Sequence, residues 1–273
     1  MFDPKIKPGS QLNNKKLCDI FKCSPQGGMR KSNTTNTLVV ISNHIRSIYD
    51  DRWIGDVFHY TGMGMTGDQS LDFMQNKTLA ESLTNDISVH LFEVFEDKIY
   101  TYIGQVELAN SPYTETQADQ DGNDRQVWMF PLKLVSGKQP ALPADKIKNI
   151  ALIKENKAKK LSDQELRLRA KKSGKKAGTR TISIIQYERS VWVSEYTKRK
   201  ANGICQLCKQ KAPFNNKSGE PYLETHHIIW LSEGGEDSID NTVALCPNCH
   251  RKMHILNRDS DRLKLIKENR ENG

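Results

Sequence analysis

The sequence reads Cys205-Gln206-Leu207-Cys208 and, after 37 further residues, Cys246-Pro247-Asn248-Cys249. Met1–Ser10 lacks the apolar stretch of a secretory signal, so we expect an intracellular, cytoplasmic protein. In a reducing compartment, paired C-x-x-C units favour metal binding over disulfide bonds. Four thiolates at this spacing predict a closed, tetrahedral Zn²⁺ site with a structural role. The surrounding segment has few large apolar residues, so the metal would stabilise the fold in place of a large core.

Histidines cluster around the same cysteine pairs. His226 lies on a predicted strand, and His250 and His254 lie one turn apart on one face of a predicted helix. These three residues can form a second, open metal site. His227 points to the opposite side of the strand and is therefore free to act as a base. Asn241 can hold a loop, or the ring of this base, through its amide.

This arrangement resembles the HNH, or ββα-metal, nucleases, and most closely their McrA-type branch, over roughly Ser190–Leu256. The resemblance implies hydrolysis of a DNA phosphodiester at a catalytic divalent cation, Mg²⁺ or Mn²⁺. It implies that His226 and His250 bind this ion with His254 as a third ligand, that His227 activates water, that Asn241 belongs to the catalytic set, and that Glu224 orients a histidine. The alternative is a zinc ribbon that only binds DNA.

The region from Thr37 to Leu134 has a β pattern. Four segments rich in aromatic and β-branched residues are predicted strands: Asp56–Tyr60, Val89–Phe95, Ile99–Ile103 and Gln126–Leu134. Asp97-Lys98 is the expected turn of a hairpin, and only Leu71–Leu83 has a helical pattern. Many strands with few short helices predict a sheet that closes, or curves strongly, into a barrel.

A glycine-rich turn follows the first of these strands. Tyr60–Gly67 contains G-x-G-x-x-G, but no convincing helix follows, so a dinucleotide-binding unit is not expected. Together with Asp68-Gln69-Ser70-Leu71 and Asn76-Lys77-Thr78-Leu79-Ala80, the turn resembles the SRA (YDG) family of PUA-like β-barrels, over roughly Leu38–Leu134. These domains read modified cytosine in DNA by flipping the base into a pocket.

The SRA resemblance implies a set of pocket residues. Tyr60 would stack on the flipped base, beside the turn glycines Gly62 and Gly64. Tyr49 would stack on the opposite face of the base, and Asp51, or Asp50, would bond its Watson–Crick edge. The alternative is that Tyr49 and Tyr60 are simply core residues of the barrel.

Positive charge is concentrated after Pro143. Residues 1–140 have a net charge of −3, whereas Lys146–Arg180 alone contributes +10. Ile147–Ala170 predicts one or two exposed helices, and the segment after it is a flexible basic linker. This excess predicts contacts with the DNA backbone, made by the linker lysines Lys171, Lys172, Lys175 and Lys176.

The sequence as a whole predicts an α+β protein: an SRA-like barrel with flanking helices (1–143), a basic helical linker (144–180) and a zinc-stabilised HNH module (181–273). We expect a modification-dependent, type IV-like endonuclease that acts on double-stranded DNA containing 5-methylcytosine or 5-hydroxymethylcytosine. A homodimer is expected because one HNH site cuts one strand, and no apolar run is long enough to span a membrane. Two alternatives are an HNH homing or nicking enzyme with a sequence- or structure-specific N-terminal domain, and a modified-DNA reader without catalysis.

Overall fold

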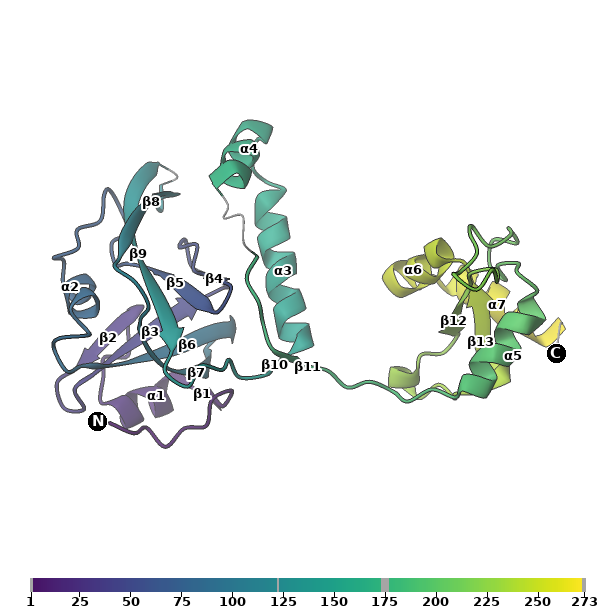
Figure 1. Cartoon of the computed structure of the whole chain (residues 1–273), viewed down its shortest axis with the longest axis horizontal. Helices are drawn as coiled ribbons and strands as arrows, with labels where there is room; N and C mark the ends of the chain where they lie inside the picture. Colours follow the sequence, from purple (N-terminus) through teal and green to yellow (C-terminus); the bar gives the residue numbers. More distant parts are fainter. Residues whose placement is uncertain (1, 122, 173–176, 272–273) are drawn as a thin grey trace. The chain divides into compact units, whose positions relative to one another are not determined.

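The computed structural model describes residues 2–121, 123–172 and 177–271, except for the side chains of Lys172 and Glu271. The chain divides into two compact units, Met1–Ile184 and Ile185–Gly273 (Figure 1). Within the described ranges, no helix has the length and apolar character needed to cross a membrane.

The first unit is built on a nine-stranded sheet. Its hydrogen-bonded order is β2-β3-β6-β7-β9-β5-β4, with β1 paired to β7 and β8 paired to β9. The bounds are β1 Gln11–Leu12, β2 Met29–Ser32, β3 Thr37–Asn43, β4 Arg52–Ile54, β5 Val57–Thr61, β6 Ser88–Glu96, β7 Ile99–Leu108, β8 Tyr113–Ala118 and β9 Asp124–Leu134. The predicted hairpin is confirmed, since β6 and β7 pair antiparallel and Lys98 in the turn has φ 63°.

The predicted closed barrel is wrong. Among the described residues the sheet ends at β2 and β4, and these two short strands do not pair with each other. Closure requires both edges to meet in register along their length. Here the edges are covered instead: α2 (Gln75–Ala80) contacts β2, and residues 177–179 lie against the β4–β5 turn, where the Thr179 hydroxyl donates to Gly55 O at 3.0 Å. Covering an edge is another way of protecting it from unwanted pairing.

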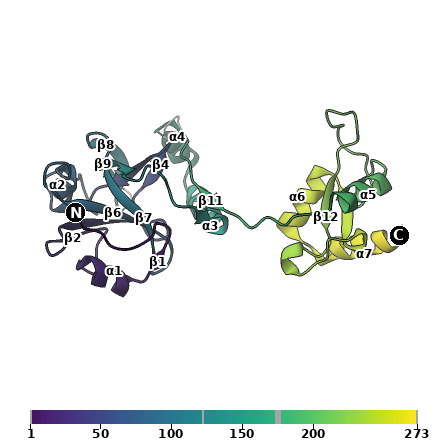
Figure 2. The same cartoon turned by 60° about the horizontal axis from the view of Figure 1, so that its bottom comes forward.

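Apolar residues cover both faces of the sheet. Along β3, Leu38 and Val40 belong to one buried cluster and Val39 and Ile41 to the other. This alternation follows from the two-residue repeat of a strand. The second cluster is capped by α1 (Asn14–Phe21), which lies beside β1 and β7 (Figure 2). The apolar run in β3 is therefore continuous because both of its faces are buried.

Two helical predictions for this unit can be compared with the structure. The helices predicted within Ile147–Ala170 are confirmed as α3 (Ala144–Ala158) and α4 (Asp163–Lys172), both within the first unit. They are mostly exposed, but α3 buries Ile150 in the core of that unit. The unit closes with a parallel pair, β10 (Leu142–Pro143) and β11 (Ile182–Ser183). The helix predicted over Leu71–Leu83 is shorter, because Met74 adopts φ 44° and the helix of α2 starts only after it.

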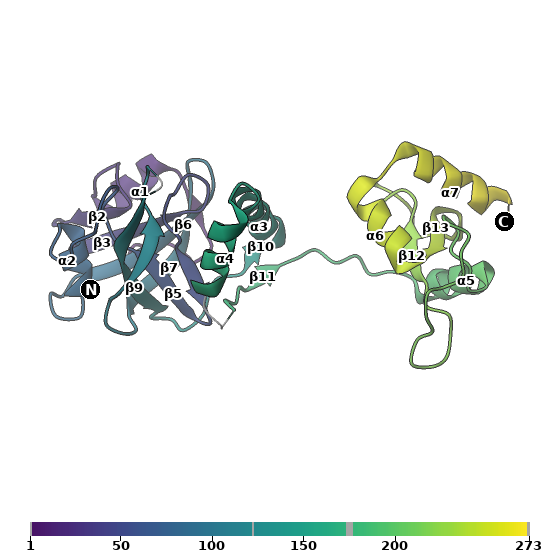
Figure 3. The ribbon, with the colours of Figure 1, turned by 90° about the horizontal axis from the view of Figure 1, so that it is seen from above.

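The second unit is a small sheet surrounded by helices. β12 (Glu224–His227) pairs antiparallel with β13 (Thr242–Leu245), and Figure 3 shows α5 (Val191–Ala201), α6 (Pro247–Leu256) and α7 (Asp259–Glu271) around this pair. Two 3₁₀ turns, η1 (Leu231–Glu233) and η2 (Ile239–Asn241), lie between the strands. The buried cluster consists of small and aliphatic residues together with Cys205 and Cys246.

Candidate functional site

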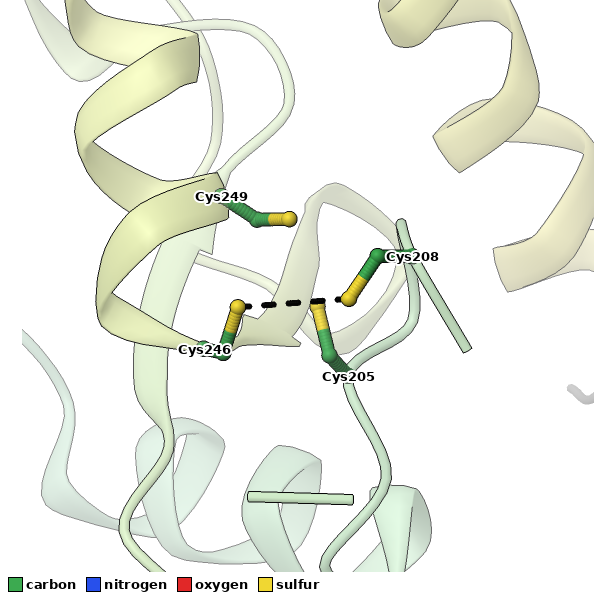
Figure 4. A group of neighbouring side chains, drawn as sticks. All are labelled: Cys205, Cys208, Cys246 and Cys249. Carbon is green, nitrogen blue, oxygen red and sulfur yellow. Dashed lines mark hydrogen bonds between the residues drawn. The ribbon is translucent and has the colours of Figure 1, made fainter. Parts of the chain in front are cut away.

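The four predicted cysteines converge on one point. Figure 4 shows their thiols directed toward one another, and their Sγ atoms all lie within 4.8 Å of each other. The Sγ atoms of Cys208 and Cys246 are 4.0 Å apart. Zn–S bonds of about 2.3 Å in a tetrahedron place two sulfurs a little under 4 Å apart. The four-cysteine cluster is therefore consistent with a structural Zn²⁺ ion.

Local structure explains this convergence. Cys246 caps the N-terminus of α6, with Pro247 at the first helical position, so Cys249 follows on the first turn. On the other side, the Lys209 N–H donates to Cys205 O at 2.8 Å, and Lys209 has φ 61°. This tight turn points both thiols of the first pair to one side.

A second group consists of His226 on β12 and of His250 and His254 on α6. Their ring nitrogens lie within 4.8 Å of one another. Burial, together with the neighbouring rings of His250 and His254, lowers the pKa of His226 to about 3, so its ring is neutral. His226 Nε2 is buried, and among the described residues it has no hydrogen-bond partner. A neutral imidazole with an unused lone pair suits a metal ligand.

Glu224 fixes the orientation of one ring in this group. Its Oε2 contacts Nδ1 of His250, and its Oε1 accepts a hydrogen bond from the Tyr222 hydroxyl at 3.1 Å. Nε2 of His250 is thereby left on the side of His254, whose Nε2 is 3.1 Å away. A carboxylate that holds the far nitrogen of a histidine is a common arrangement around metal sites.

His227 has different partners from its neighbour on the strand. Its Nε2 lies 2.8 Å from Oδ1 of Asp237, and Oδ2 of Asp237 accepts the backbone N–H of Ser190 at 2.6 Å. These two hydrogen bonds hold the pKa of Asp237 below its usual value. Sequence reasoning missed Asp237, because it follows His227 by ten positions in a loop without a regular repeat.

Asn241 holds the loop and not the ring of His227. Its Oδ1 accepts the N–H of Ile229 at 2.9 Å, and its Nδ2 donates to the carbonyls of Ile229 and Glu236 at 2.9 and 2.8 Å. The loop passes so close that a Cβ on Gly235 would lie 2.0 Å from Ile229 O. The sequence left open whether this amide holds a loop or the ring of the base, and its contacts are those of a residue that holds the loop.

A pocket of about 210 Å³ opens at these residues. Its walls include the predicted site residues His226, His227, His250 and His254, together with Thr225, Leu231 and Ser232. They also include Tyr187, Arg189 and Trp230, which sequence reasoning did not select. Arg189 is exposed, and it brings a positive charge to the mouth of the pocket. Both neighbouring strand histidines thus reach one cavity.

In the first unit, the SRA-like motif residues brace the glycine turn. The Gln69 amide donates to Gly62 O at 2.7 Å and accepts the N–H of Trp128 at 2.9 Å. Asn76 accepts the N–H of Met63 at 2.7 Å. A Cβ on Gly62 would lie 2.9 Å from both amide oxygens, so the close approach requires glycine. The linked motifs therefore have a structural explanation.

The predicted pocket residues are close to one another but mostly enclosed. Tyr60 is only 4% exposed, packs within the core cluster, and donates its hydroxyl to Gly28 O at 2.9 Å. Asp51 is buried and accepts the N–H of Thr61 at 2.8 Å; burial raises its pKa. For Tyr60 this is the core position that the sequence left as the alternative, and its stacking on a base stays a prediction.

Tyr49 and Asp50 are more accessible. Tyr49 is half-buried and donates its hydroxyl to Gly64 O at 2.9 Å, with the guanidinium of Arg125 lying 5.9 Å from its ring centre. Asp50 is exposed and pairs with Arg52 at 3.3 Å. The geometry favours Asp51 over Asp50 as the residue that faces the interior.

Only one of the four linker lysines can be placed with its side chain. Lys171 is exposed near the end of α4. The side chain of Lys172, and all of Lys175 and Lys176, lie outside the described residues.

Two families match the chain. Residues 205–255 match the HNH endonuclease family, and residues 8–155, more than half of the chain, match the ScoMcrA-like SRA domain family. The type IV methyl-directed restriction enzyme EcoKMcrA of Escherichia coli strain K12 is 44% identical over 80 residues, which make up 29% of each protein. The matched part thus spans less than a third of this relative.

Two solved structures are similar over most of the chain. The type IV phosphorothioation-dependent restriction endonuclease ScoMcrA has 17% identity and a TM-score of 0.41, covering 98% of this chain and 63% of that one. The modification-dependent TagI restriction endonuclease has 21% identity and a TM-score of 0.36, covering 92% and 79%. On the family matches, the chain belongs to the ScoMcrA-like SRA domain family, as an McrA-like protein with an N-terminal SRA domain and a C-terminal HNH endonuclease domain.

Proposed function

We propose that this protein is a modification-dependent endonuclease whose first unit reads a modified base in double-stranded DNA and whose second unit hydrolyses a phosphodiester. One observation carries the proposal: a single pocket is lined by the three-histidine group and by His227, whose Nε2 is held by Asp237. The relatives support it, since EcoKMcrA is described as methyl-directed and ScoMcrA as phosphorothioation-dependent.

In the proposed reaction, His226 and His250 hold a divalent cation, Mg²⁺ or Mn²⁺, with His254 as the third ligand. When bound, such an ion offsets negative charge on the phosphate and on the departing 3′ oxygen. His227 takes a proton from the attacking water at Nδ1, because its Nε2 faces Asp237. Arg189, at the rim of the pocket, binds an oxygen of the scissile phosphate.

For the reader, we propose a pocket for 5-methylcytosine or 5-hydroxymethylcytosine formed by Tyr49, Tyr60 and Asp51, with Gly62 and Gly64 in the adjoining turn. Asp51 would bond the Watson–Crick edge of the flipped base. Because Tyr60 and Asp51 are buried, the base enters only if the segments that cover them move. The basic segment 144–180 would contact phosphates, and a homodimer would cut both strands.

Digestion of matched plasmids tests the proposal as a whole. The substrates are unmodified DNA and DNA with 5-methylcytosine, 5-hydroxymethylcytosine, N6-methyladenine or phosphorothioate. We expect metal-dependent cleavage of the two modified-cytosine plasmids only. Equal cleavage of all five would favour a homing or nicking enzyme, and tight binding without cleavage in Mg²⁺ or Mn²⁺ would favour a non-catalytic reader.

Substitutions at the two sites separate reading from cutting. His227→Ala should abolish cleavage and leave zinc content and DNA affinity unchanged, because a base acts only in the transition state. Tyr60→Ala should weaken binding to modified DNA by roughly 1–3 kcal/mol, the usual contribution of one stacked base, and weaken binding to unmodified DNA much less. Wild-type cleavage by His227→Ala, or equal losses on both DNAs for Tyr60→Ala, would contradict the assigned roles.

Salt dependence tests the basic segment. Replacing Lys171, Lys172, Lys175 and Lys176 with Gln should flatten the slope of log affinity against log salt by about 0.9 for each phosphate that is no longer neutralised. Selectivity for modified DNA should survive, because phosphate contacts position the protein without reading bases. An unchanged slope would show that these lysines only solvate the segment.

A further inference from the structure

Asp237 connects the proposed base to the start of a helix. It lies between η1 and η2, and both of its carboxylate oxygens are used: Oδ1 is 2.8 Å from His227 Nε2, and Oδ2 accepts the Ser190 N–H at 2.6 Å. Ser190 is the N-cap of α5. A loop residue anchored from two sides in this way has a fixed carboxylate, and its side chain is only 26% exposed.

We propose that Asp237 is a positioning residue that selects the catalytic tautomer of His227. The inference rests on the proposed role of His227 as the base. An ionised carboxylate only accepts hydrogen bonds, so the proton of a neutral His227 must lie on Nε2. Nδ1 is then unprotonated and free to take a proton from water. Without Asp237, the ring can adopt either tautomer, and only one of them can act as a base at Nδ1.

The position of the ring does not depend on Asp237 alone. The backbone of His227 is held opposite Thr242 in the β12–β13 pair, and the residue is buried. Asp237 therefore affects which ring nitrogen of His227 carries the proton more than it affects where the ring lies. An experiment can separate these two effects.

Asp237→Asn reverses that hydrogen bond. The Ser190 N–H is a fixed donor, so the Asn oxygen must face Ser190 and the Asn NH₂ must face His227. His227 Nε2 then has to accept, which moves the ring proton to Nδ1. We expect kcat for cleavage of a modified plasmid to fall about 10²–10⁴-fold, the usual contribution of a general base, with DNA affinity and zinc content unchanged. Asp240→Asn, an exposed residue of the same loop, is the charge-matched control and should keep full activity.

A double variant shows whether Asp237 acts through His227. The residual rate of His227→Ala, measured in single turnover with excess enzyme, should not fall further when Asp237→Asn is added, because the effect of Asp237 disappears with the ring. A further loss in the double variant would overturn the proposal. So would wild-type kcat for Asp237→Asn while His227→Ala is inactive, and that result would leave the proposed function intact. Full activity of His227→Ala would instead refute the proposed function.

Nitrogen-15 NMR of the histidine rings tests the tautomer without any variant. In the zinc-loaded protein, His227 should show a protonated Nε2 and an unprotonated Nδ1. The opposite pattern in the wild type would overturn the inference, even if Asp237→Asn failed to fold.

Discussion

The two units differ in how their folds are stabilised. The first unit fully buries four phenylalanines, Phe21, Phe58, Phe92 and Phe130, on a sheet with apolar clusters on both faces. The buried cluster of the second unit contains no aromatic residue among those described and includes two of the four cysteines. Because apolar burial stabilises roughly in proportion to area, the second unit gains far less free energy from its core than the first unit does. We therefore expect its fold to depend on a metal ion held by the four-cysteine cluster.

The same difference decides how each unit uses its motif residues. In the first unit the large core encloses them: Tyr60 packs among apolar side chains, and Gln69 and Asn76 brace a turn. In the second unit the motif histidines line a pocket and are held by carboxylates, His250 by Glu224 and His227 by Asp237. In the unit with the small core, hydrogen bonds organise the site residues.

Removal of zinc should produce the largest effect. Cys246→Ser, or chelation, should unfold the second unit, because a structural zinc site contributes on the order of 10–16 kcal/mol of binding free energy to folding. The first unit should melt as before. Calorimetry should show two transitions, of which only one depends on metal. Cys23→Ser, a free thiol of the first unit outside the cluster, is the control and should leave the metal-dependent transition unchanged. A single cooperative transition that disappears on chelation would show that the two units are not stabilised independently.

An ion pair buried in the first unit should come next. Glu93 is fully buried and is paired with the guanidinium of Arg180 at 2.6 and 2.5 Å and with His44 at 2.7 Å. Arg180→Ala leaves this carboxylate without its main partner, which typically costs about 3–5 kcal/mol. Urea unfolding of the first unit measures the loss.

Arg199→Ala is the matched control in the second unit. Its pair with Glu195 at 2.5 Å is exposed, and exposed pairs contribute at most about 1 kcal/mol. Equal effects of Arg180→Ala and Arg199→Ala would show that Glu93 is not isolated from water.

The sequence predicts the parts of the fold that depend on local pattern. Alternation and turn residues locate the strands around Asp97-Lys98, and C-x-x-C spacing locates the cysteine cluster. The open sheet was not predictable, because the covering of β4 comes from residues 177–179, more than a hundred residues away along the chain. No local signal reports such a contact.

The site shows the same limit. His226, His250 and His254 gather as the strand and helix repeats predict. Asp237, which contacts His227, and Arg189, which lines the pocket, were missed because each lies in an irregular segment. The backbone geometry of the loops determines where these two side chains lie, and this geometry cannot be read from the spacing of residues in the sequence. For Tyr60 the motif predicts contact with a base, but the structure places the side chain in the core.

Acid should destabilise the first unit through His90. Burial lowers the pKa of His90 to about 4, since its Nδ1 has only the Tyr102 hydroxyl at 3.0 Å and its Nε2 has no partner among the described residues. The unfolded chain binds a proton below about pH 6.5 and the folded chain only below about pH 4. Stability is therefore lost as pH falls between these values, by up to about 3 kcal/mol.

Hydrogen exchange of the β6 and β7 amides follows this loss within the first unit. His90→Gln can keep a hydrogen bond to Tyr102 but does not titrate, so its stability should depend less on pH over the same range. An identical pH dependence in His90→Gln would assign the effect to another group. Below about pH 4.5, protonation of Glu93 in the unfolded chain adds to the loss, because its folded pKa is about 2.

The smallest effect concerns the hydroxyls of Tyr60 and Tyr49. Tyr60→Phe removes the bond to Gly28 O and should cost about 1 kcal/mol of stability. Tyr49→Phe should cost less, because Tyr49 is only half-buried and Gly64 O still accepts from Arg125 at 2.6 Å. Both variants keep their rings, so selectivity for modified DNA should be unchanged if these rings stack on a base. If Tyr60→Phe costs nothing, the bond to Gly28 O contributes no net stability. The stability of this one variant thus measures whether the hydroxyl, and not only the ring, fixes Tyr60 in the core.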